Sequence, residues 1–483
     1  MKRTAFLIAI LFTTIGSLSW GQTQTKEGQD TLSFSLMFIG DIMQHSTQIS
    51  SAYNPVEDDY DYNSCFQYVK PVIESADYTI ANLELTLAGK PYAGYPQFSA
   101  PDNLAVALKN AGIDFLVTAN NHSLDRRKKG LERTIDFLDS MQIPHTGTFK
   151  TQVEKDSTYP YMLEEKGFKL AILNYTYGTN GIRVTTPNVV NMINKEQIGK
   201  DIELAKSKKP DAIIVVMHWG KEYVNLPNES QKSLAKFCFE KGANAIIGAH
   251  PHVLQPIEFS KYEDPTKNKL VAYSLGNYVS NQRTRGRDGG MMVELKLKKT
   301  PNDGKTWIDD AGYHLTWVYR TRDLLKDFYI LPTSIHTNDT TLIKEKVDID
   351  KMNLFIKDSR ALLGKHNKNV GEYTYTPREI EEEKEEEVIA QEPEEEEEEI
   401  VSEPEVLSYK IQFFVSSKTL NPKKLPKKYR KDISSEKAGE VNKYLIGNFE
   451  TSEKALAFLE EFKKDSDFKD AYIVIYKNGN RME

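Results

Sequence analysis

Five short apolar segments in the first part of the chain each end in polar side chains that can bind metal or phosphate. They span residues 34–39, 78–81, 115–118, 213–217 and 245–247. Their length and apolar character are typical of buried strands. Because the carboxyl ends of parallel strands meet at one edge of an open α/β sheet, we expect the polar residues that follow to converge on one rim.

The segment at 245–247 is followed by a pair of histidines, His250 and His252, with Pro251 between them. In an extended backbone this spacing places both imidazoles on one face, where they can serve one metal ion or two adjacent ions. A lone histidine is more often a packing or capping residue. The repetition of the pattern in five segments favours a metal site.

Segments with the periodicity of a helix lie between several of these predicted strands. Apolar residues recur at helical spacing in 101–111, 131–141, 198–206 and 230–241, and further strands are predicted at 170–174 and 270–275. Regular alternation of strands and helices predicts an α/β fold for a front domain over residues 32–373.

The first 21 residues have the composition of a signal peptide. A basic start is followed by an apolar run at 5–15 and small residues at 16–21, with a cleavage site after Gly21. The apolar run is too short for a permanent span. We therefore expect export to the periplasm or cell envelope, with membrane contact only through this segment; an uncleaved N-terminal anchor is the alternative.

The two cysteines, Cys65 and Cys238, lie far apart in the chain, and Cys238 falls on the apolar face of a predicted helix. We expect two separate buried thiols and not a disulfide.

Residues 379–405 form an acidic segment with 16 Glu against one Lys, a charge of −15 within a chain of net charge −7. So few apolar side chains cannot bury a core, which predicts a disordered linker. A helical rod would be interrupted by Pro393 and Pro404. Calcium binding is the alternative function.

Three imidazoles, two carboxylates and one amide form the candidate metal site of the front domain. They belong to Asp41, Glu84, Asn121, His218, His250 and His252. This mixed set suits two divalent ions such as Mn²⁺, Zn²⁺ or Fe²⁺ better than calcium. Two such ions can hold a phosphate ester and lower the pKa of a bridging water. His122 could then protonate the leaving oxygen or bind the phosphate, and Asp125 could orient its imidazole.

Six blocks in order, FIGDIM, ANLELTL, TANNHSLD, VMHWGKEY, GAHPHVLQPIE and YSLGNYV, resemble the CapA family of capsule and poly-γ-glutamate synthesis proteins. This family is a branch of the calcineurin-like metallophosphoesterases. The resemblance implies a four-layer α/β/β/α sandwich with the site at its rim. It also implies metal binding by the six residues named above and catalytic or phosphate contact by His122.

The sequence departs from the standard metallophosphoesterase pattern, which opens with Asp-x-His. Here Asp41 is followed by Ile42 and Met43, and Glu84 replaces the usual second Asp. His45 either replaces the missing imidazole or has a packing role. The departure leaves two functions open: a phosphoesterase-type hydrolase of an envelope polymer, or a non-catalytic module that binds or exports an anionic polymer. We expect no nucleic-acid partner.

Two basic tracts are candidates for substrate contact. Asn277 ends a strand, and Arg283, Arg285 and Arg287 follow in a glycine-containing loop where arginines could clamp phosphate or carboxylate groups. A plain surface loop is the alternative. The run at 126–129 could attract an anionic polymer or simply form a solvated helix face.

The rear domain, 406–483, is predicted as strands at 408–415, 444–448 and 471–475 with a helix at 452–464, a small α+β unit. Its segments YKIQFFVSS, YLIGNFETSEKALAFLEEFK and DAYIVIYKNG resemble the SPOR family, and this resemblance implies binding to peptidoglycan glycan strands that lack stem peptides. Gln412 and Tyr444 are the candidate glycan contacts. Its 16 basic against 11 acidic residues give a charge of +5. A structural domain without a ligand is the alternative.

Overall fold

The computed structural model describes residues 31–55, 57–322, 327–375, 407–416, 419–421, 425–438, 441–466, 468, 471–477 and 480–481. The predicted signal peptide at 1–21 and the predicted linker at 379–405 lie outside the described residues. The chain divides into two compact units, residues 1–380 and 381–483. We call them the front unit and the rear unit.

A nine-stranded sheet forms one half of the front unit. Its main path runs β18 (Phe328–Pro332), β17 (Thr306–Arg320), β16 (Gly289–Lys299), β1 (Leu32–Ile42), β4 (Tyr78–Leu83), β5 (Phe115–Val117) and β6 (His145–Thr146). Two short strands attach to this path: β15 (Asn277–Val279) pairs with β1, and β19 (Gly371–Glu372) pairs with β17. The strands from β1 to β6 are parallel.

A six-stranded sheet forms the other half. Its order is β13 (Leu254–Ser260), β14 (Lys269–Leu275), β12 (Ala245–Ala249), β11 (Ala212–His218), β9 (Phe168–Thr176) and β8 (Tyr161–Glu165). The four inner strands are parallel, and each outer strand is antiparallel to its neighbour. Small two-stranded sheets join β2 (Tyr53–Asn54) to β3 (Asp59–Tyr60) and β7 (Thr148–Phe149) to β10 (Val189–Val190).

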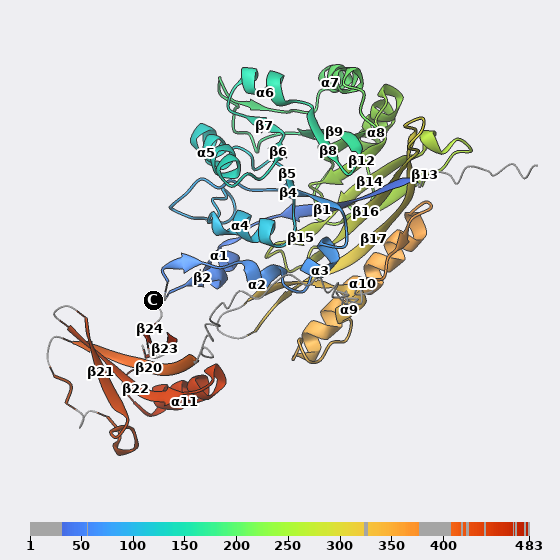
Figure 1. Cartoon of the computed structure of the whole chain (residues 1–483). Helices are drawn as coiled ribbons and strands as arrows, with labels where there is room; N and C mark the ends of the chain where they lie inside the picture. The colour runs from blue at the N-terminus through green and yellow to red at the C-terminus, as the bar shows by residue number, and fades with distance from the viewer. Residues whose placement is uncertain are drawn as a thin grey trace, which may run out of the picture. The chain divides into compact units, whose positions relative to one another are not determined.

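The two sheets pack face to face, with helices on their outer faces. Between the sheets, Phe34 and Phe38 of β1 share one core with Ile214 and Val216 of β11. A second core joins the nine-stranded sheet to α2 (Asn63–Phe66), α3 (Lys70–Ile73), α4 (Asn103–Asn110) and α5 (Arg127–Ser140). A third joins the six-stranded sheet to α7 (Lys195–Ser207) and α8 (Glu229–Lys241) (Figure 1). The α/β prediction is confirmed, and the layers follow the order helix, sheet, sheet, helix.

This layering explains the apolar runs in the sequence. In β11, alternate residues such as Ile214 and Ile213 enter different cores, one between the sheets and one under the helices. Because both faces of an inner parallel strand are covered, the strand reads as continuously apolar. All five predicted strand segments correspond to strands, namely β1, β4, β5, β11 and β12.

The four predicted helices correspond to α4, α5, α7 and α8. The long β16–β17 hairpin and α10 (Lys346–His366) were not predicted from the sequence. Besides α2 and α3, the described part of the front unit contains the short α-helices α1 (Ser46–Ala52), α6 (Gln152–Thr158) and α9 (Thr333–His336). No helix among the described residues combines the length and apolar character needed to cross a membrane.

Both cysteines are buried and free, Cys65 in α2 and Cys238 in α8, which confirms the prediction of separate thiols. Burial raises the pKa of each thiol to about 12.

The described residues of the rear unit form a five-stranded antiparallel sheet, one α-helix and a short 3-10 helix, η3 (Lys427–Tyr429). The order of the sheet is β21 (Ile433–Ala438), β22 (Val441–Phe449), β20 (Leu407–Ser416), β23 (Tyr472–Lys477) and β24 (Asn480–Arg481). The helix α11 (Ser452–Asp465) begins at Thr451, whose hydroxyl accepts the backbone N–H of Lys454. The predicted strands and helix are present, and β21 and β24 were not predicted.

Candidate metal centre

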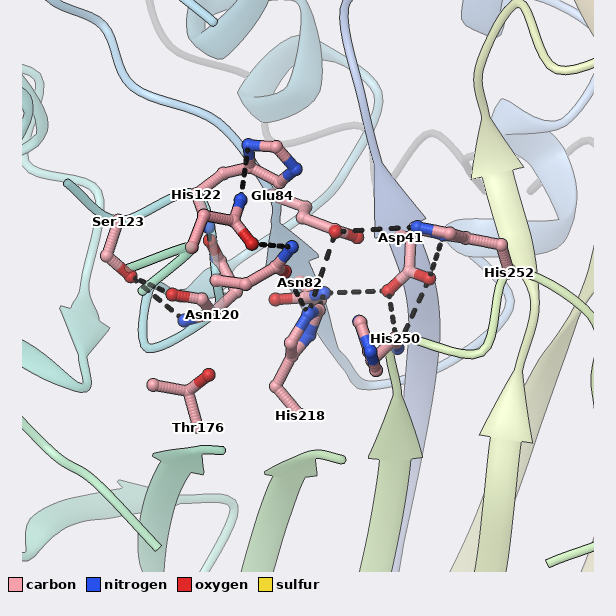
Figure 2. Close-up of polar contacts among 12 residues, drawn as sticks. Asp41, Asn82, Glu84, Asn120, His122, Ser123, Thr176, His218, His250 and His252 are labelled. Atoms are coloured by element: carbon pink, nitrogen blue, oxygen red, sulfur yellow. Dashed lines mark hydrogen bonds and ion pairs between the residues drawn. The ribbon is translucent and has the colours of Figure 1, made fainter. Parts of the chain in front are cut away.

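The polar residues that end the five strands lie together at one edge of the sandwich. In the nine-stranded sheet Asp41 pairs with Asn82, after a register shift in β1. In the six-stranded sheet His218 ends β11 beside Ala249, the last residue of β12. Figure 2 shows Asp41, Glu84, His218, His250 and His252 pointing toward one another. Convergence of strand ends therefore brings these predicted ligands into one cluster.

Asp41 is fully buried at the end of β1 and accepts hydrogen bonds on both oxygens. Asn82 Nδ2 donates to Oδ1 over 2.8 Å, and His252 Nδ1 lies 3.0 Å from Oδ2. The backbone N–H of His250 lies 3.3 Å from both oxygens. Burial opposes ionisation of this carboxyl, but the contacts from His252 and Asn82 outweigh it and lower its pKa. Asp41 is therefore an anion within the cluster.

Glu84 is the opposite case, a fully buried carboxylate with no hydrogen-bond partner on either oxygen among the described residues. Its Oε1 lies 3.6 Å from Nε2 of His218 and 3.7 Å from Nε2 of His252. Burial, followed by the nearby charge of Asp41, raises the pKa of Glu84 well above its usual value. An unpartnered interior carboxylate is energetically unfavourable, so this group requires a partner.

His218 and Asn121 join the cluster from the two different sheets. Nε2 of His218 lies 2.6 Å from Oδ1 of Asn121, and its Nδ1 lies 3.3 Å from Nδ2 of Asn82. Burial and the neighbouring imidazole of His250 lower the pKa of His218 well below its usual value. A neutral imidazole is the form that binds a metal.

The loop between β12 and β13 adopts an unusual backbone in order to present its two histidines. His250 and His252 have φ values of 98° and 56°. Residues other than glycine rarely adopt positive φ values, and backbone strain of this kind is concentrated at functional sites. Burial lowers the pKa of His250 to about 3. Its Nδ1 has no hydrogen-bond partner among the described residues.

Two glycines allow the backbone to close around the cluster. A Cβ on Gly40, before Asp41, would lie 2.4 Å from the carbonyl oxygen of Gly276. A Cβ on Gly248, before the histidine loop, would lie 1.9 Å from the carbonyl oxygen of Tyr273. Both contacts are closer than a side chain permits, so these positions require glycine.

His122 and Asp125 form a separate pair next to the cluster. Nδ1 of His122 lies 2.7 Å from Oδ2 of Asp125, which also accepts the backbone N–H of Phe98 over 2.7 Å. The ring of Phe98 lies 4.6 Å from the imidazole. These contacts fix the ring and leave Nε2 as the nitrogen without a hydrogen bond among the described residues. Asp125 is therefore placed to orient His122, as the sequence predicted.

The cluster fits a divalent cation. Two groups of three residues offer potential ligand atoms, and within each group these atoms lie within 4.8 Å of one another. The groups are Glu84 with His250 and His252, and Asp41 with Glu84 and His218. Glu84 belongs to both groups and has no other partner. A cation among these nitrogen and oxygen atoms would supply the partner that the buried carboxylate lacks.

Two predicted substrate contacts are engaged elsewhere. Arg283 donates to the carbonyl oxygen of Val318 over 2.6 Å, and Arg285 binds Asp358 through two nitrogens at 2.6 and 2.8 Å. No hydrogen bond or ion pair joins either arginine to the cluster in the part of the chain that the structure describes. These two assignments are therefore corrected, because each guanidinium already has a protein partner.

Asn277 and His45 lie near the cluster without entering it. Asn277 pairs with Asp41 in the sheet, but its Nδ2 donates to the carbonyl oxygen of Arg287 over 2.8 Å. Nδ1 of His45 accepts the backbone N–H of Asn281 over 3.2 Å. The structure therefore favours a packing role for His45.

Several residues of the site were not assigned by the sequence analysis. Asn82 contacts both Asp41 and His218 through its Nδ2. The ring centre of Tyr177 lies 4.4 Å from that of His250. Tyr223 lies 6.1 Å from His252. Of the three, only Asn82 carried a usable signal, because it follows a predicted strand directly.

Comparison with known proteins shows the family. The model of the family described as "Bacterial capsule synthesis protein PGA_cap" matches residues 35–282. The chain belongs to this family. It is 31% identical over 315 residues to the "PGA biosynthesis protein CapA" of Bacillus subtilis, covering 62% of this chain and 77% of that protein. It is 31% identical over 272 residues to the "Capsule biosynthesis protein CapA" of Bacillus anthracis, covering 53% of this chain and 62% of that protein.

Solved structures also show similarity, at lower levels. NAD nucleotidase of Haemophilus influenzae is 14% identical with a TM-score of 0.38, and the match covers 69% of this chain and 68% of that one. The calcineurin-like phosphoesterase YfkN of Bacillus subtilis is 17% identical with a TM-score of 0.38, with coverage of 59% and 91%.

The predicted glycan contacts of the rear unit are buried. Gln412 is 4% exposed and its Nε2 donates to the hydroxyl of Tyr472. Tyr444 is 8% exposed and its hydroxyl accepts the backbone N–H of Leu420 over 3.0 Å. Both side chains stabilise the interior of the unit, so neither is free to contact a glycan. The assignment of these two residues is therefore corrected.

Proposed function

We propose that this protein is a metal-dependent hydrolase of the phosphoester type. The observation that carries the proposal is the buried carboxylate of Glu84. It has no hydrogen-bond partner in the part of the chain that the structure describes, and it belongs to both groups of potential ligands. Glu84, His250 and His252 could hold one divalent ion, and Asp41, Glu84 and His218 could hold a second, which would supply Lewis-acid chemistry to a phosphoester. Asn121 would add an amide oxygen to the second group.

The chain's own residues would position and protonate the substrate. Bound cations would polarise a phosphoryl oxygen and lower the pKa of a bound water. His122 receives its orientation from Asp125 through Nδ1, which leaves Nε2 to donate a proton to the leaving oxygen. Tyr177 and Tyr223 are 46% and 40% exposed and border the buried cluster on its solvent side.

We infer that this chemistry serves the synthesis or processing of an envelope polymer. Relatives named for capsule and PGA biosynthesis support a capsule, poly-γ-glutamate or other envelope polymer as the substrate. Export through the predicted signal peptide at 1–21 would bring the protein to the periplasm or cell envelope.

A non-catalytic binding or export module is the alternative function. It is favoured by Met43, which stands where the standard motif has a histidine and is buried in the apolar core under the helices. One imidazole is therefore absent from the first metal position, and no described residue replaces it.

Metal analysis and an activity screen separate the two functions. We expect purified full-length protein to retain about two Mn²⁺, Zn²⁺ or Fe²⁺ ions and to hydrolyse phosphomonoesters or phosphodiesters. The variants His250→Ala and His252→Ala should lose metal. His366→Ala, in the last turn of α10 and outside the cluster, is the control. Metal binding without hydrolysis would support the binding module, and full metal content in both variants would refute the site.

We further propose that the rear unit tethers the protein to peptidoglycan glycan strands. Its α+β architecture and its charge of +5 over residues 406–483 support this role. Since Gln412 and Tyr444 are buried, the surface hollow that includes Lys410, Lys431 and Asn448 is the better candidate for contact. Full-length protein should pellet with purified sacculi, more strongly after amidase treatment removes stem peptides. A chain ending at residue 378 should stay in solution, and retention of that truncated chain would contradict tethering.

A further inference from the structure

One guanidinium of the arginine loop at 283–287 is not engaged by the protein. Arg283 and Arg285 bind Val318 and Asp358 as described above. The Cζ of Arg287 lies 3.4 Å from the centre of the Tyr223 ring. No hydrogen bond or ion pair involves this guanidinium among the described residues. Of the three arginines in the loop, Arg287 is therefore the one whose guanidinium makes no hydrogen bond or ion pair with the described residues.

The backbone of Arg287 is fixed against the candidate metal centre. Its carbonyl oxygen accepts Nδ2 of Asn277 over 2.8 Å, and Asn277 pairs with Asp41 in the sheet. Its backbone N–H donates to the carbonyl oxygen of Thr284 over 3.0 Å. These contacts tie the arginine to the same strand end that presents Asp41.

Tyr223, on which Arg287 stacks, is tied to the histidine loop. Its backbone N–H donates over 2.8 Å to the carbonyl oxygen of Pro251, the residue between His250 and His252. Its φ of 65° is unfavourable for a bulky residue and persists only where surrounding contacts fix it. Its ring centre lies 6.1 Å from that of His252. The guanidinium of Arg287 therefore contacts the ring of Tyr223, which in turn lies against the imidazole of the candidate ligand His252.

We propose that Arg287, held by Tyr223, forms an oxyanion-binding subsite beside the metal cluster and takes a carboxylate or phosphate group of the substrate. A guanidinium stacked on an aromatic ring keeps the N–H groups at its edge free for bidentate contact with such an anion. The inference rests on the proposed function, since the reacting group would lie at the cluster and its anionic neighbour at Arg287. The substrate class is a chain that carries a second anionic group next to the reacting one.

Calorimetric titration of full-length protein with two probes tests the subsite. Triglutamate supplies carboxylates and tripolyphosphate supplies phosphates, and each is titrated with and without Mn²⁺. We expect Arg287→Ala to weaken binding of at least one probe tenfold or more, because it removes charge-assisted hydrogen bonds. Arg287→Lys should recover part of the affinity, since lysine offers a point charge without the planar fork.

The matched control is Arg360→Ala, in which the lost guanidinium binds Glu372 through two nitrogens at 2.7 and 2.9 Å. It should bind both probes as the wild type does. A loss confined to triglutamate assigns the subsite to carboxylates, and a loss confined to tripolyphosphate assigns it to phosphates. Equal affinity of wild type and Arg287→Ala for both probes, or no binding of either probe by the wild type, would overturn the subsite.

Metal content, measured on the same samples, keeps this outcome separate from the proposed function. Arg287→Ala should retain the metal content of the wild type, because Arg287 is not among the candidate ligands. If the wild type holds no metal, the proposed function fails, while the comparison of probe affinities without Mn²⁺ still decides the subsite.

Discussion

The front unit and the rear unit use polar residues differently. In the front unit they end strands and gather at the candidate metal centre, and in the rear unit they lie within strands and bond to neighbouring residues. Asp41, Glu84 and His218 follow apolar runs and lie together, and neither carboxylate oxygen of Glu84 has a hydrogen-bond partner among the described residues. Gln412 and Tyr444 lie inside antiparallel strands, and each bonds to a neighbour in the same unit. A polar residue at the end of a strand is therefore a candidate ligand, whereas a polar residue within a strand is a packing residue. Residue type alone does not distinguish the two.

The substitution expected to change stability most is Glu84→Gln, in the front unit. With Mn²⁺ present, the wild type should be more stable than the variant by about 4 kcal/mol, the linkage expected at a thousandfold excess over the dissociation constant. Without metal, the variant should equal or exceed the wild type, because the substitution removes an unpartnered buried carboxyl.

Thermal unfolding with Mn²⁺ and with a chelator measures both differences. His366→Ala should respond to metal as the wild type does. If Mn²⁺ leaves the wild-type unfolding temperature unchanged, the candidate ligands are packing residues like those of the rear unit.

The close approach of backbone around the front site gives the next effect. Gly248→Ala should destabilise the protein by about 3 kcal/mol, at the upper end of overpacking, because its Cβ would lie 1.9 Å from a carbonyl oxygen. Gly364→Ala is the matched control within α10, where a Cβ meets nothing within 4 Å. It should stabilise the protein by about 0.5–1 kcal/mol. Denaturant unfolding of both variants measures these changes, and similar stabilities would contradict a tightly closed rim.

A smaller effect is expected at the His122–Asp125 pair. Asp125→Asn keeps the shape of the side chain but alters the group that orients His122. We expect a fall in kcat of about 10–100-fold, as for other residues that orient a reactive group, with metal content unchanged. Steady-state kinetics on a substrate identified in the screen give kcat and KM separately. An unchanged kcat would show that the orientation of His122 does not limit the reaction.

The strand ends were predictable because parallel inner strands are apolar on both faces and stop abruptly. Their convergence followed from the shared direction of parallel strands. The position of Asn82 at a strand end was predictable, but its contact with Asp41 was not, because that contact depends on the register shift that places Asn82 opposite Asp41. The strand β16 did carry a sequence signal, since Glu294, Lys296 and Lys298 alternate with apolar residues as in a half-buried strand. It was missed because this alternation differs from the continuous apolar runs by which the inner strands were predicted.

The arginine loop shows a different limit. Arg283, Arg285 and Arg287 are equivalent in the sequence, and long-range contacts distinguish them. Arg285 binds Asp358 of α10, which lies 73 residues further along the chain. Such a partner leaves no local pattern, so the sequence could not show that the fold engages Arg283 and Arg285 elsewhere.

The smallest effect concerns the rear unit and tests the other half of the comparison. Tyr444→Phe removes the oxygen that accepts the backbone N–H of Leu420, so we expect a loss of about 1–2 kcal/mol in the stability of the rear unit. Because Tyr444 is buried, retention on sacculi should be unchanged at temperatures where the unit stays folded. Asn448→Ala, at an exposed position in the surface hollow, should show the reverse: lower retention and a stability change within about 0.5 kcal/mol. Chemical unfolding and sacculus pelleting of the full-length variants measure the two properties. If Tyr444→Phe lowered retention while Asn448→Ala did not, the buried tyrosine would have a binding role, and the contrast between the two units would fail.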